Sequence, residues 1–263
     1  LPGRVGVQPG LTFLDAVNVP SGSGTGDDRY GFDEGAGTAW VVDGATDVGT
    51  ARLFPDIGAD ADAPKFGWES DAAWYADRLS ERFTQPPEKG ESAPAYLERV
   101  IRDIADRARS DASVPIDGQP RHNLPSAGGI WMRRQEDTLE IATLGDCMAI
   151  VDTGGQCEIV GDIDGIREEY RRWGETMRSG DREAGFAQAR DMRNRMNTDG
   201  AHWVFSLHPE AARHAELTRI ALRGDTGVLL MSDGFFRLVE PYGAYDGLGL
   251  MTAARDEDGL SRL

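Results

Sequence analysis

Three apolar segments of the chain each end in an aspartate with a glycine beside it. They are WVVDG, which ends in Asp43 and Gly44, ATLGD, which ends in Asp146, and VLLMSDG, which contains Asp233. Apolar runs of this kind, bounded by glycine, indicate buried β-strands. A carboxylate at the mouth of a buried strand sits on a rigid element and can hold a cation at a fixed distance. The glycine beside it allows a sharp turn or lets a backbone carbonyl approach a metal.

An acidic pair, Asp27 and Asp28, adds to these motifs. It follows the flexible segment PSGSGTG and precedes the first of the three strands. Taken alone, a strand followed by Asp-Gly is more readily explained as a turn. Three such motifs together with the acidic pair favour a cation site, because Mg²⁺ and Mn²⁺ prefer oxygen ligands.

The order of these motifs resembles that of the metal-dependent serine/threonine phosphatases of type 2C. The segment LEIATLGDCMAIV, residues 139–151, is similar to the strand–GDS–strand signature of that family, with Cys147 in the serine position. The segment GVLLMSDGFFRLV, residues 227–239, closely resembles the family's late SDG motif, and SAGGI, residues 126–130, resembles its small-residue strand entry. The resemblance covers about residues 18–239 and is carried mainly by the GD and SDG motifs together.

The resemblance implies an α+β fold in which an antiparallel β-sandwich is flanked by helices on both sides, in four layers. It also implies two or three Mn²⁺ or Mg²⁺ ions at one end of the sandwich. The residues that would hold them are Asp27, Asp28, Asp43, Gly44, Asp146 and Asp233.

Each of these residues has an implied role. Asp43 would bridge two ions, and the Gly44 carbonyl would bind one of them. Asp28, with or without Asp27, would bind directly or through water. Asp233 would bind on the other side, and Asp146 would help to hold a weaker third ion.

The implied reaction is hydrolysis of a phosphate monoester by a hydroxide that bridges two metal ions. Catalysis would then depend on Asp43 and Asp233, and no serine or cysteine nucleophile is required. We expect Cys147 to be a small buried residue.

The sequence departs from the family pattern at three positions. Many members place a phosphate-binding arginine just before the acidic pair, where this chain has SGSGTG; Arg29, Arg4 and Arg52 are the alternatives. Some members carry a histidine after the Asp-Gly, whereas the four histidines here lie elsewhere in the sequence. The family also closes with a strand that carries a metal-binding aspartate, and no aspartate after Asp233 follows an apolar strand. We therefore expect the last strand to be missing from this chain.

The remaining elements are expected from periodicity and turn residues. Strands are expected at 11–19, 38–42, 129–134, 138–144, 148–152, 157–160, 201–207, 215–222 and 227–231. Two amphipathic helices are expected around 68–83 and over 94–109. Residues 162–197 are charged and helical, and they lie where family members insert a flap near the active site.

Length, charge and cysteine content limit the class of protein. A chain of 263 residues suits one domain, 1–263. The 45 Asp and Glu against 28 Lys and Arg give a net charge of −17, which repels nucleic acid and anionic membranes. Two cysteines form neither a disulfide framework nor a zinc cluster. With no apolar run of about 20 residues and no signal peptide at its start, a cytoplasmic protein is expected.

Three functions remain open at this stage. The first is a phosphatase that acts on phosphoserine or phosphothreonine in proteins. The second keeps the metal ions but takes a small phosphorylated metabolite as substrate. The third is a non-catalytic module of the same fold that binds a partner, and the four aspartates suited to cations count against it.

Overall fold

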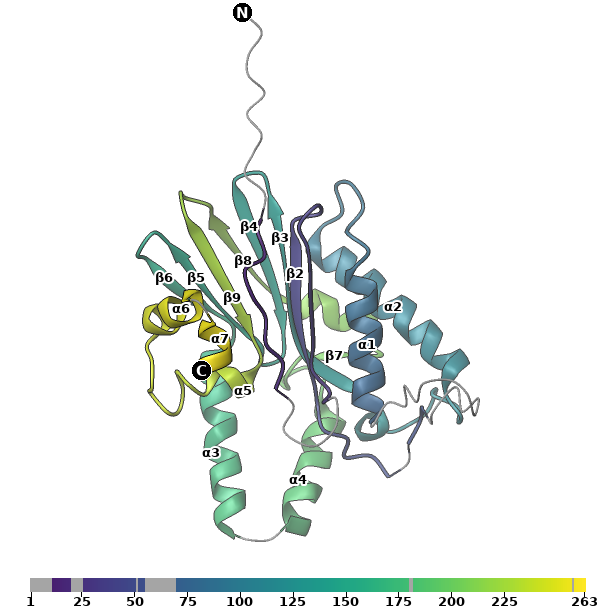
Figure 1. Ribbon diagram of the computed structural model, residues 1–263. Coiled ribbons are helices and arrows are strands. Elements are labelled where there is room, and N and C mark those ends of the chain that lie inside the picture. Colours follow the sequence, from purple (N-terminus) through teal and green to yellow (C-terminus); the bar gives the residue numbers. More distant parts are fainter. Residues whose placement is uncertain (1–10, 20–25, 51, 55–69, 180–181, 257) are drawn as a thin grey trace, which may run out of the picture.

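A computed structural model describes residues 11–19, 26–50, 52–54, 70–179, 182–256 and 258–263. Two antiparallel sheets form the centre of the molecule (Figure 1). The first sheet has the strand order β1-β2-β3-β4-β8, with β7 paired to β3, and the second has the order β6-β5-β9. The strands are β1 Arg29–Asp33, β2 Thr38–Gly44, β3 Ser126–Gln135, β4 Thr138–Leu144, β5 Met148–Thr153, β6 Cys157–Val160, β7 Phe205–Ser206, β8 Glu216–Ala221 and β9 Thr226–Met231.

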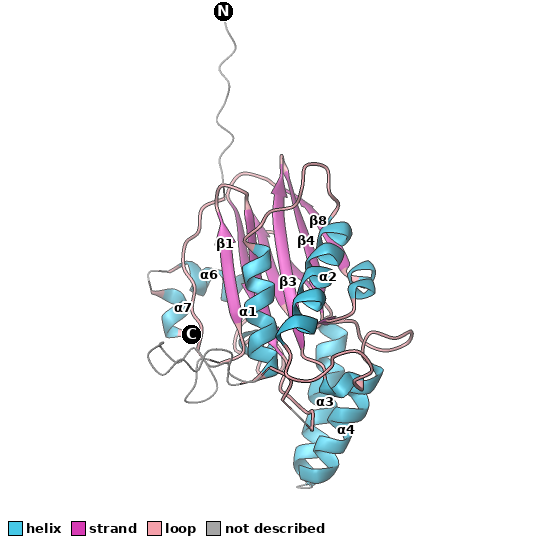
Figure 2. Cartoon of the chain, turned by 90° about the vertical axis from the view of Figure 1, so that its right-hand side faces the viewer, coloured by secondary structure: helices cyan, strands magenta, loops and turns pink. Residues whose placement is uncertain are grey.

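Helices cover both outer faces of this pair of sheets (Figures 1 and 2). Helices α1 (Asp71–Phe83) and α2 (Ala93–Asp111) pack on the first sheet. Helices α5 (Asp233–Phe236) and α6 (Gly247–Arg255), with the start of α3 (Ile163–Ser179), pack on the second. Short α7 (Gly259–Arg262) follows α6, and two 3₁₀ turns are η1 (Arg121–Asn123) and η2 (Pro209–His214). The expected four-layer α+β sandwich is thus confirmed.

Side-chain alternation along the strands explains the layers, because successive residues of a strand point to opposite faces of its sheet. In β3, Trp131 packs towards α1 and α2, whereas Ile130 and Met132 face the second sheet. In β5, Ala149 faces the first sheet and Ile150 faces the outer helices. Three apolar layers result, one between the sheets and one under each group of helices.

Most of the expected elements are present, but two expected strands need correction and one strand, β1, was not expected. Residues 11–19 form no strand, although Phe13 stacks on Phe32 of β1 with ring centroids 3.7 Å apart. The strand at the edge of the first sheet is β1, whose alternation of small, polar and aromatic residues gave no apolar run. The strand expected at 201–207 is reduced to Phe205 and Ser206. The backbone before it is hydrogen-bonded to Asn197 instead of to a strand: Val204 N donates to Asn197 Oδ1 at 2.8 Å, and Asn197 N donates to His202 O.

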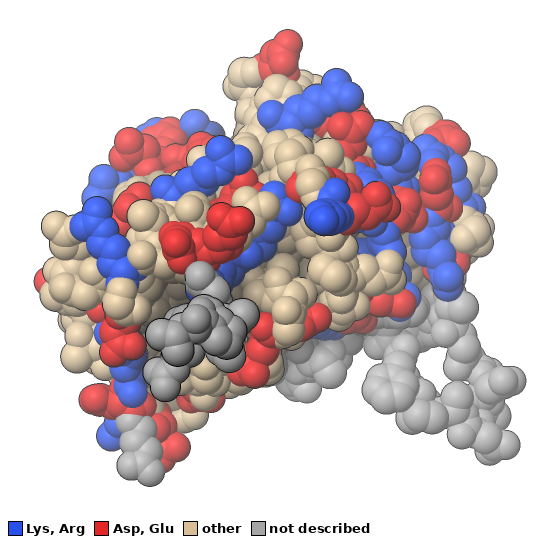
Figure 3. All heavy atoms as spheres, turned by 90° about the horizontal axis from the view of Figure 1, so that it is seen from above, with Lys and Arg blue, Asp and Glu red and all other residues tan. Residues whose placement is uncertain are grey.

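The charged segment 162–197 forms a helical hairpin of α3 and α4 (Arg182–Arg195) that extends beyond one end of the sandwich (Figure 1). At the opposite end, Lys and Arg side chains are interspersed with Asp and Glu (Figure 3). None of the helices in the described part of the chain is long and apolar enough to span a lipid bilayer.

A buried carboxylate connects α1 to the segment that precedes it. Asp71, at the first position of α1, accepts hydrogen bonds from Leu53 N at 2.6 Å and Phe54 N at 3.0 Å. Leu53 and Phe54 are fully buried, and Phe54 stacks on Trp74 with centroids 3.7 Å apart. The carboxylate therefore satisfies two backbone donors that the fold removes from water.

We predict that Asp71→Ala lowers the free energy of unfolding by about 2–4 kcal/mol, because it leaves two buried N–H groups without an acceptor. Urea unfolding of both proteins measures the difference. The control is Asp106→Ala, which removes an exposed carboxylate paired with Arg109 on the surface of α2 and should change stability little. Equal effects of the two substitutions would contradict this role for Asp71.

Candidate metal and phosphate site

Strand register brings the aspartates of the sequence motifs to one end of the sandwich. Asp43 in β2 is paired with Gly128 in β3, and the neighbouring Gly129 is paired with Leu144, two residues before Asp146. Asp146 therefore lies at the same end of the first sheet as Asp43.

The second sheet and the first strand bring in the other two motifs. Met148 of β5 pairs with Met231 of β9, so Asp146 before the one and Asp233 after the other share that end. At the edge, Arg29 of β1 pairs with Val42, which places Asp28 next to Asp43.

Close backbone approaches explain why glycine accompanies two of these aspartates. A Cβ on Gly44 would lie 2.6 Å from Asp27 Cβ and 2.7 Å from Asp27 O. A Cβ on Gly128 would lie 2.2 Å from Asp146 Oδ1. Both contacts are far too short for a real side chain, so glycine at these positions is what lets the acidic residues come so near the strands. Gly145 serves the other expected purpose, since its φ of 91° turns the chain sharply before Asp146.

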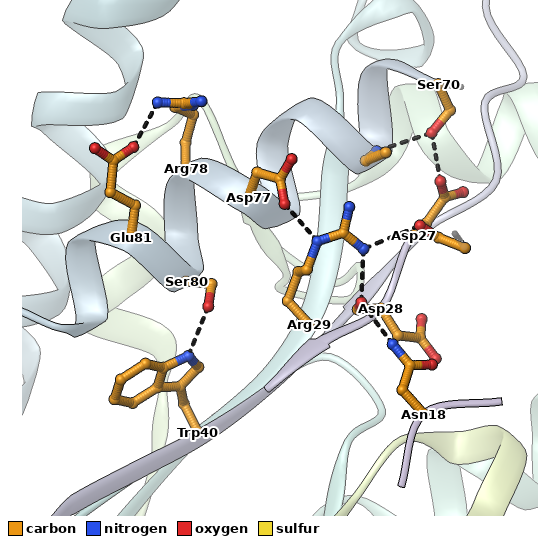
Figure 4. A network of polar contacts seen from close by, with 12 residues as sticks. Asn18, Asp27, Asp28, Arg29, Trp40, Ser70, Asp77, Arg78, Ser80 and Glu81 are labelled. Carbon is orange, nitrogen blue, oxygen red and sulfur yellow. Dashed lines mark hydrogen bonds and ion pairs between the residues drawn. The ribbon is translucent and has the colours of Figure 1, made fainter. Parts of the chain in front are cut away.

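The acidic pair is held in place by α1 and by the start of β1 (Figure 4). The Ser70 hydroxyl donates to Asp27 Oδ1 at 2.6 Å and also accepts from Ala73 N at 2.8 Å, so the N-cap of α1 fixes Asp27. Arg29 Nη1 donates to the carbonyls of Gly26 at 3.0 Å and Asp28 at 2.7 Å. The Arg29 Nε pairs with Asp77 of α1.

These contacts show what the arginines named as alternatives for phosphate binding do in the fold. Arg29 is committed to the backbone of the acidic loop and to Asp77, and Arg52 contacts Phe54 O and the buried carboxylate of Asp71. Both arginines thus support the fold. Arg4 lies outside the described residues.

The carboxyl groups perturb one another strongly. Burial, reinforced by the charges of Asp28, Asp146 and Asp233, raises the pKa of Asp43 well above that of an ordinary aspartate. Asp28 is hydrogen-bonded to Asp43, and burial raises its pKa as well. Burial, with the nearby charges of Glu169 and Asp233, raises the pKa of Asp146 to about 7. Burial and mutual repulsion therefore favour either protons or bound cations among these carboxyl groups.

Asp233 is engaged on one side only. Its Oδ2 accepts from Arg237 Nη2 at 3.2 Å and lies 3.4 Å from the Tyr170 hydroxyl, which is also 3.1 Å from Asp233 O. Within the described residues, its Oδ1 forms no hydrogen bond and remains able to bind a cation. Sequence reasoning missed Tyr170 and Arg237, although Arg237 lies one helical turn after Asp233, at a spacing that favours an ion pair.

A large hollow of about 1340 Å³ opens beside the carboxylates. Asp43, Gly44, Asp146 and Asp233 lie on its wall, and the facing surfaces of α3 and α4 form much of the remainder. His202 and His214 also line it, although they lie far from the motifs in the sequence; Trp203 stacks on His214 with ring centroids 3.4 Å apart. No sequence signal placed these two histidines there.

The donor set fits hard divalent cations. All of its members are oxygen ligands, carboxylates or the Gly44 carbonyl, which suit Mg²⁺ and Mn²⁺ better than soft metals. Burial and neighbouring carboxylates raise the pKa values of Asp28, Asp43 and Asp146, so a cation bound among them would be favoured. In the part of the chain that the structure describes, no group of three or more His, Cys, Asp or Glu side chains is already arranged as a metal-binding cluster. Cation binding would therefore have to draw the carboxylates together.

Asp246 and Asp258, which follow Asp233 in the sequence, have structural roles at helix ends. Asp246 is the N-cap of α6 and accepts from Gly249 N at 2.7 Å, and Asp258 precedes α7 with a φ of 56°. Both belong to helix termini, as the absence of an apolar strand before them indicated. Asp47 contacts the start of α1, since Asp71 N donates to its Oδ2 at 2.7 Å.

Comparisons with known proteins find similar structures but no similar sequence. No family model and no curated protein matches this sequence. The solved serine/threonine phosphatase PstP/Ppp of Mycobacterium tuberculosis is similar over 97% of this chain and 87% of its own, with a TM-score of 0.51 and 13% identity. A solved bacterial serine phosphatase is similar over 93% of this chain and 86% of its own, with a TM-score of 0.51 and 13% identity. This chain therefore has the fold of the metal-dependent type 2C serine/threonine phosphatases.

Proposed function

We propose that this protein is a metal-dependent phosphatase that hydrolyses phosphate monoesters, with phosphoserine and phosphothreonine in proteins as its substrates. The observation that carries the proposal is the convergence of Asp43, Asp146 and Asp233 on the wall of one hollow, with Asp28 hydrogen-bonded to Asp43. These residues come from distant parts of the chain and from both sheets. A fold that needed them only as turn residues would not bury them together, because their charges repel.

Each of these residues would have its own part in binding Mn²⁺ or Mg²⁺. Asp43 and the Gly44 carbonyl would hold two ions together with Asp28, and Asp27 would bind through water, since Ser70 already occupies its Oδ1. Asp233 would contribute its Oδ1, and Asp146 would hold a third ion. Two bound divalent ions supply positive charge that offsets the phosphate dianion, and they lower the pKa of water towards neutrality.

The chain itself offers no competing nucleophile at the GD motif. Cys147 occupies the serine position of the signature, but its side chain is fully buried and packs between the two sheets. Burial raises the pKa of this thiol well above its usual value, which disfavours the reactive thiolate. The prediction that Cys147 is a small buried residue is confirmed.

The size of the hollow favours a protein substrate. Pockets for small ligands typically measure about 300–1,000 Å³, whereas this hollow measures about 1340 Å³ and is bordered by both helices of the hairpin. We propose that the hairpin, residues 162–197, acts as a flap that contacts the polypeptide around the phosphorylated residue. The single domain, 1–263, would then present the metal site and the flap together.

The first test is hydrolysis of p-nitrophenyl phosphate with and without Mn²⁺. We expect Mn²⁺-dependent turnover, and a loss of about 100-fold or more in Asp43→Ala and Asp233→Ala, since even groups that only support metal ligands cost about 10- to 100-fold. The control is Asp225→Ala, which removes an exposed aspartate at the far end of β9 and should leave turnover unchanged. If no turnover is seen at any Mn²⁺ concentration, the phosphatase proposal is wrong and a non-catalytic module that binds a partner is the remaining function.

The same assay separates the two substrate classes. We expect phosphoserine and phosphothreonine peptides to show higher kcat/KM values than small phosphorylated metabolites. The reverse order would assign the protein to small-molecule phosphatases of the same fold.

Metal binding should also depend on pH in a defined direction. The folded-state pKa values of Asp28, Asp43 and Asp146 are raised, so the metal-free native state keeps protons that the unfolded chain releases above about pH 4. Stability from these groups is therefore lost as pH rises from about 4 towards 7, the pKa of Asp146. A cation that replaces the protons should restore it, because metal ligands must be deprotonated.

We thus predict that saturating Mg²⁺ or Mn²⁺ raises Tm more at about pH 8 than at about pH 5, relative to chelator at the same pH. At 100 times Kd the gain corresponds to about 2.7 kcal/mol. Asp43→Asn should abolish most of it. An equal gain at both pH values, or one that survives in Asp43→Asn, would contradict metal binding at this cluster.

A further inference from the structure

Four arginines line the hollow within the part of the chain that the structure describes: Arg172, Arg193, Arg195 and Arg237. Three of them have carboxylate partners. Arg172 pairs with Glu168 at 2.8 Å, Arg195 with Asp191 at 2.7 Å, and Arg237 with Asp233 at 3.2 Å. Arg193 differs, because its hydrogen bond is to a neutral group, the Thr46 carbonyl, at 3.2 Å.

Among the described residues, no carboxylate is in contact with the guanidinium of Arg193. The side chain is half-buried, whereas the other three are exposed. Burial lowers the pKa of Arg193, and the charges of Asp47, Asp146 and Glu169 act on it from a distance in the opposite direction. A guanidinium stays protonated in proteins, so the hollow contains a partly desolvated cation within electrostatic reach of Asp146.

The part of α4 that carries Arg193 is firmly attached to the body of the protein. Arg190, one turn earlier, donates to Val48 O at 2.9 Å, on the same loop as Thr46. Just past the end of α4, Arg121 of η1 donates to Met196 O at 2.6 Å and Asn197 O at 2.9 Å. Arg193 is thus positioned by contacts on both sides, as a ligand-binding group needs to be.

The geometry points to Arg193 as the residue that binds the phosphate group of the substrate. This inference rests on the proposed function and gives it a residue that the sequence motifs did not supply. The guanidinium presents a planar set of donors that matches two phosphate oxygens, and such charge-assisted pairs are among the stronger hydrogen bonds in proteins. The arginine comes from the helical hairpin, whereas Arg29, beside the acidic pair, is used to hold the loop.

This assignment gives α4 a role distinct from that of the carboxylates. Asp43, Asp146 and Asp233 would hold cations, and Arg193 would hold the phosphate directly. The substrate would then be fixed from two sides, by positive charge bound at the end of the sandwich and by a cation of the hairpin. Arg193 acts here as a binding and positioning residue.

The test compares Arg193→Ala and Arg193→Lys with the parent protein in binding of inorganic phosphate, the product, by calorimetry in the presence of Mn²⁺. We expect Arg193→Ala to raise the Kd for phosphate about 10- to 100-fold, the loss of hydrogen bonds to a charged group. Arg193→Lys, which keeps the charge and loses the planar fork, should lie between the two. The KM for a phosphopeptide should rise in the same order, with a smaller change in kcat.

The control is Arg107→Ala, which removes an exposed arginine of α2 that pairs with Asp111 at 2.6 Å and lies outside the hollow. It should change the Kd for phosphate by no more than about twofold. In the absence of phosphate, none of the three variants should bind Mn²⁺ more weakly than the parent protein, since Arg193 is a cation and holds no metal ion. Unchanged Tm values would show that the variants fold.

The outcomes separate this inference from the proposed function. Equal phosphate affinity in the parent protein and both Arg193 variants, or no phosphate binding by any of them, overturns the inference while Mn²⁺-dependent hydrolysis can still stand. Phosphate binding that depends on Arg193 in a protein without hydrolytic activity would retain the inference and remove the catalytic function.

Discussion

Mutual repulsion among carboxyl groups is the constraint around which this molecule is organised. Asp28, Asp43, Asp146 and Asp233 act on one another electrostatically at one end of the sandwich, where burial weakens the screening that water would provide. Such an arrangement is unfavourable unless protons, arginines or metal ions offset it. A shared hydrogen bond and an arginine offset part of it here: Asp28 is hydrogen-bonded to Asp43, and Arg237 contacts Asp233. The rest of the fold supplies the rigidity that holds these groups near one another.

That rigidity comes from covered strands and from short connections to helices. Strands β2, β3, β4 and β5 carry apolar residues on both faces, so each sheet is packed against a layer on either side. This packing fixes the positions of the strand ends. The N-cap of α1 reaches Asp27 through Ser70, which links a helix packed on the first sheet to the acidic loop. On the other side of the site, Tyr170 of α3 lies within hydrogen-bond distance of Asp233. The hairpin and the carboxylates therefore share contacts.

Sequence reasoning reached the four-layer sandwich because its strands carry strong apolar runs and its turns carry glycine. It placed β4 and β6 at the bounds that the structure has, and β2, β5 and β9 within two residues of them. It failed at 11–19, where an apolar segment packs along the edge of a sheet without forming a strand, since local pattern does not report whether a backbone partner is available. It also failed at β1, whose exposed edge position needs no continuous apolar run.

The candidate site was predictable in the same uneven way. Asp43, Asp146 and Asp233 were accessible to sequence reasoning because each follows an apolar strand and neighbours a glycine. Arg193 and His214 were not, because they enter the hollow from a charged helix and a 3₁₀ turn whose composition resembles any solvated surface. Only the three-dimensional position of α4, fixed by Arg190 and Arg121, distinguishes Arg193 from the other arginines of that hairpin.

The strand register that assembles the carboxylates has a consequence for the order of folding. Asp28 lies near the start of the chain and Asp233 near its end, and their proximity requires β1 to pair with β2, β2 with β3, β3 with β4, and β5 with β9. The β2–β3 and β5–β9 pairings join segments that are far apart in the sequence, so they close long loops and form slowly compared with local helices. Asp28 and Asp43 can meet in the local β1–β2 hairpin, whereas Asp146 and Asp233 join them only after these long-range pairings form. The cost of the site falls late on the folding pathway, after the core that can tolerate it has formed.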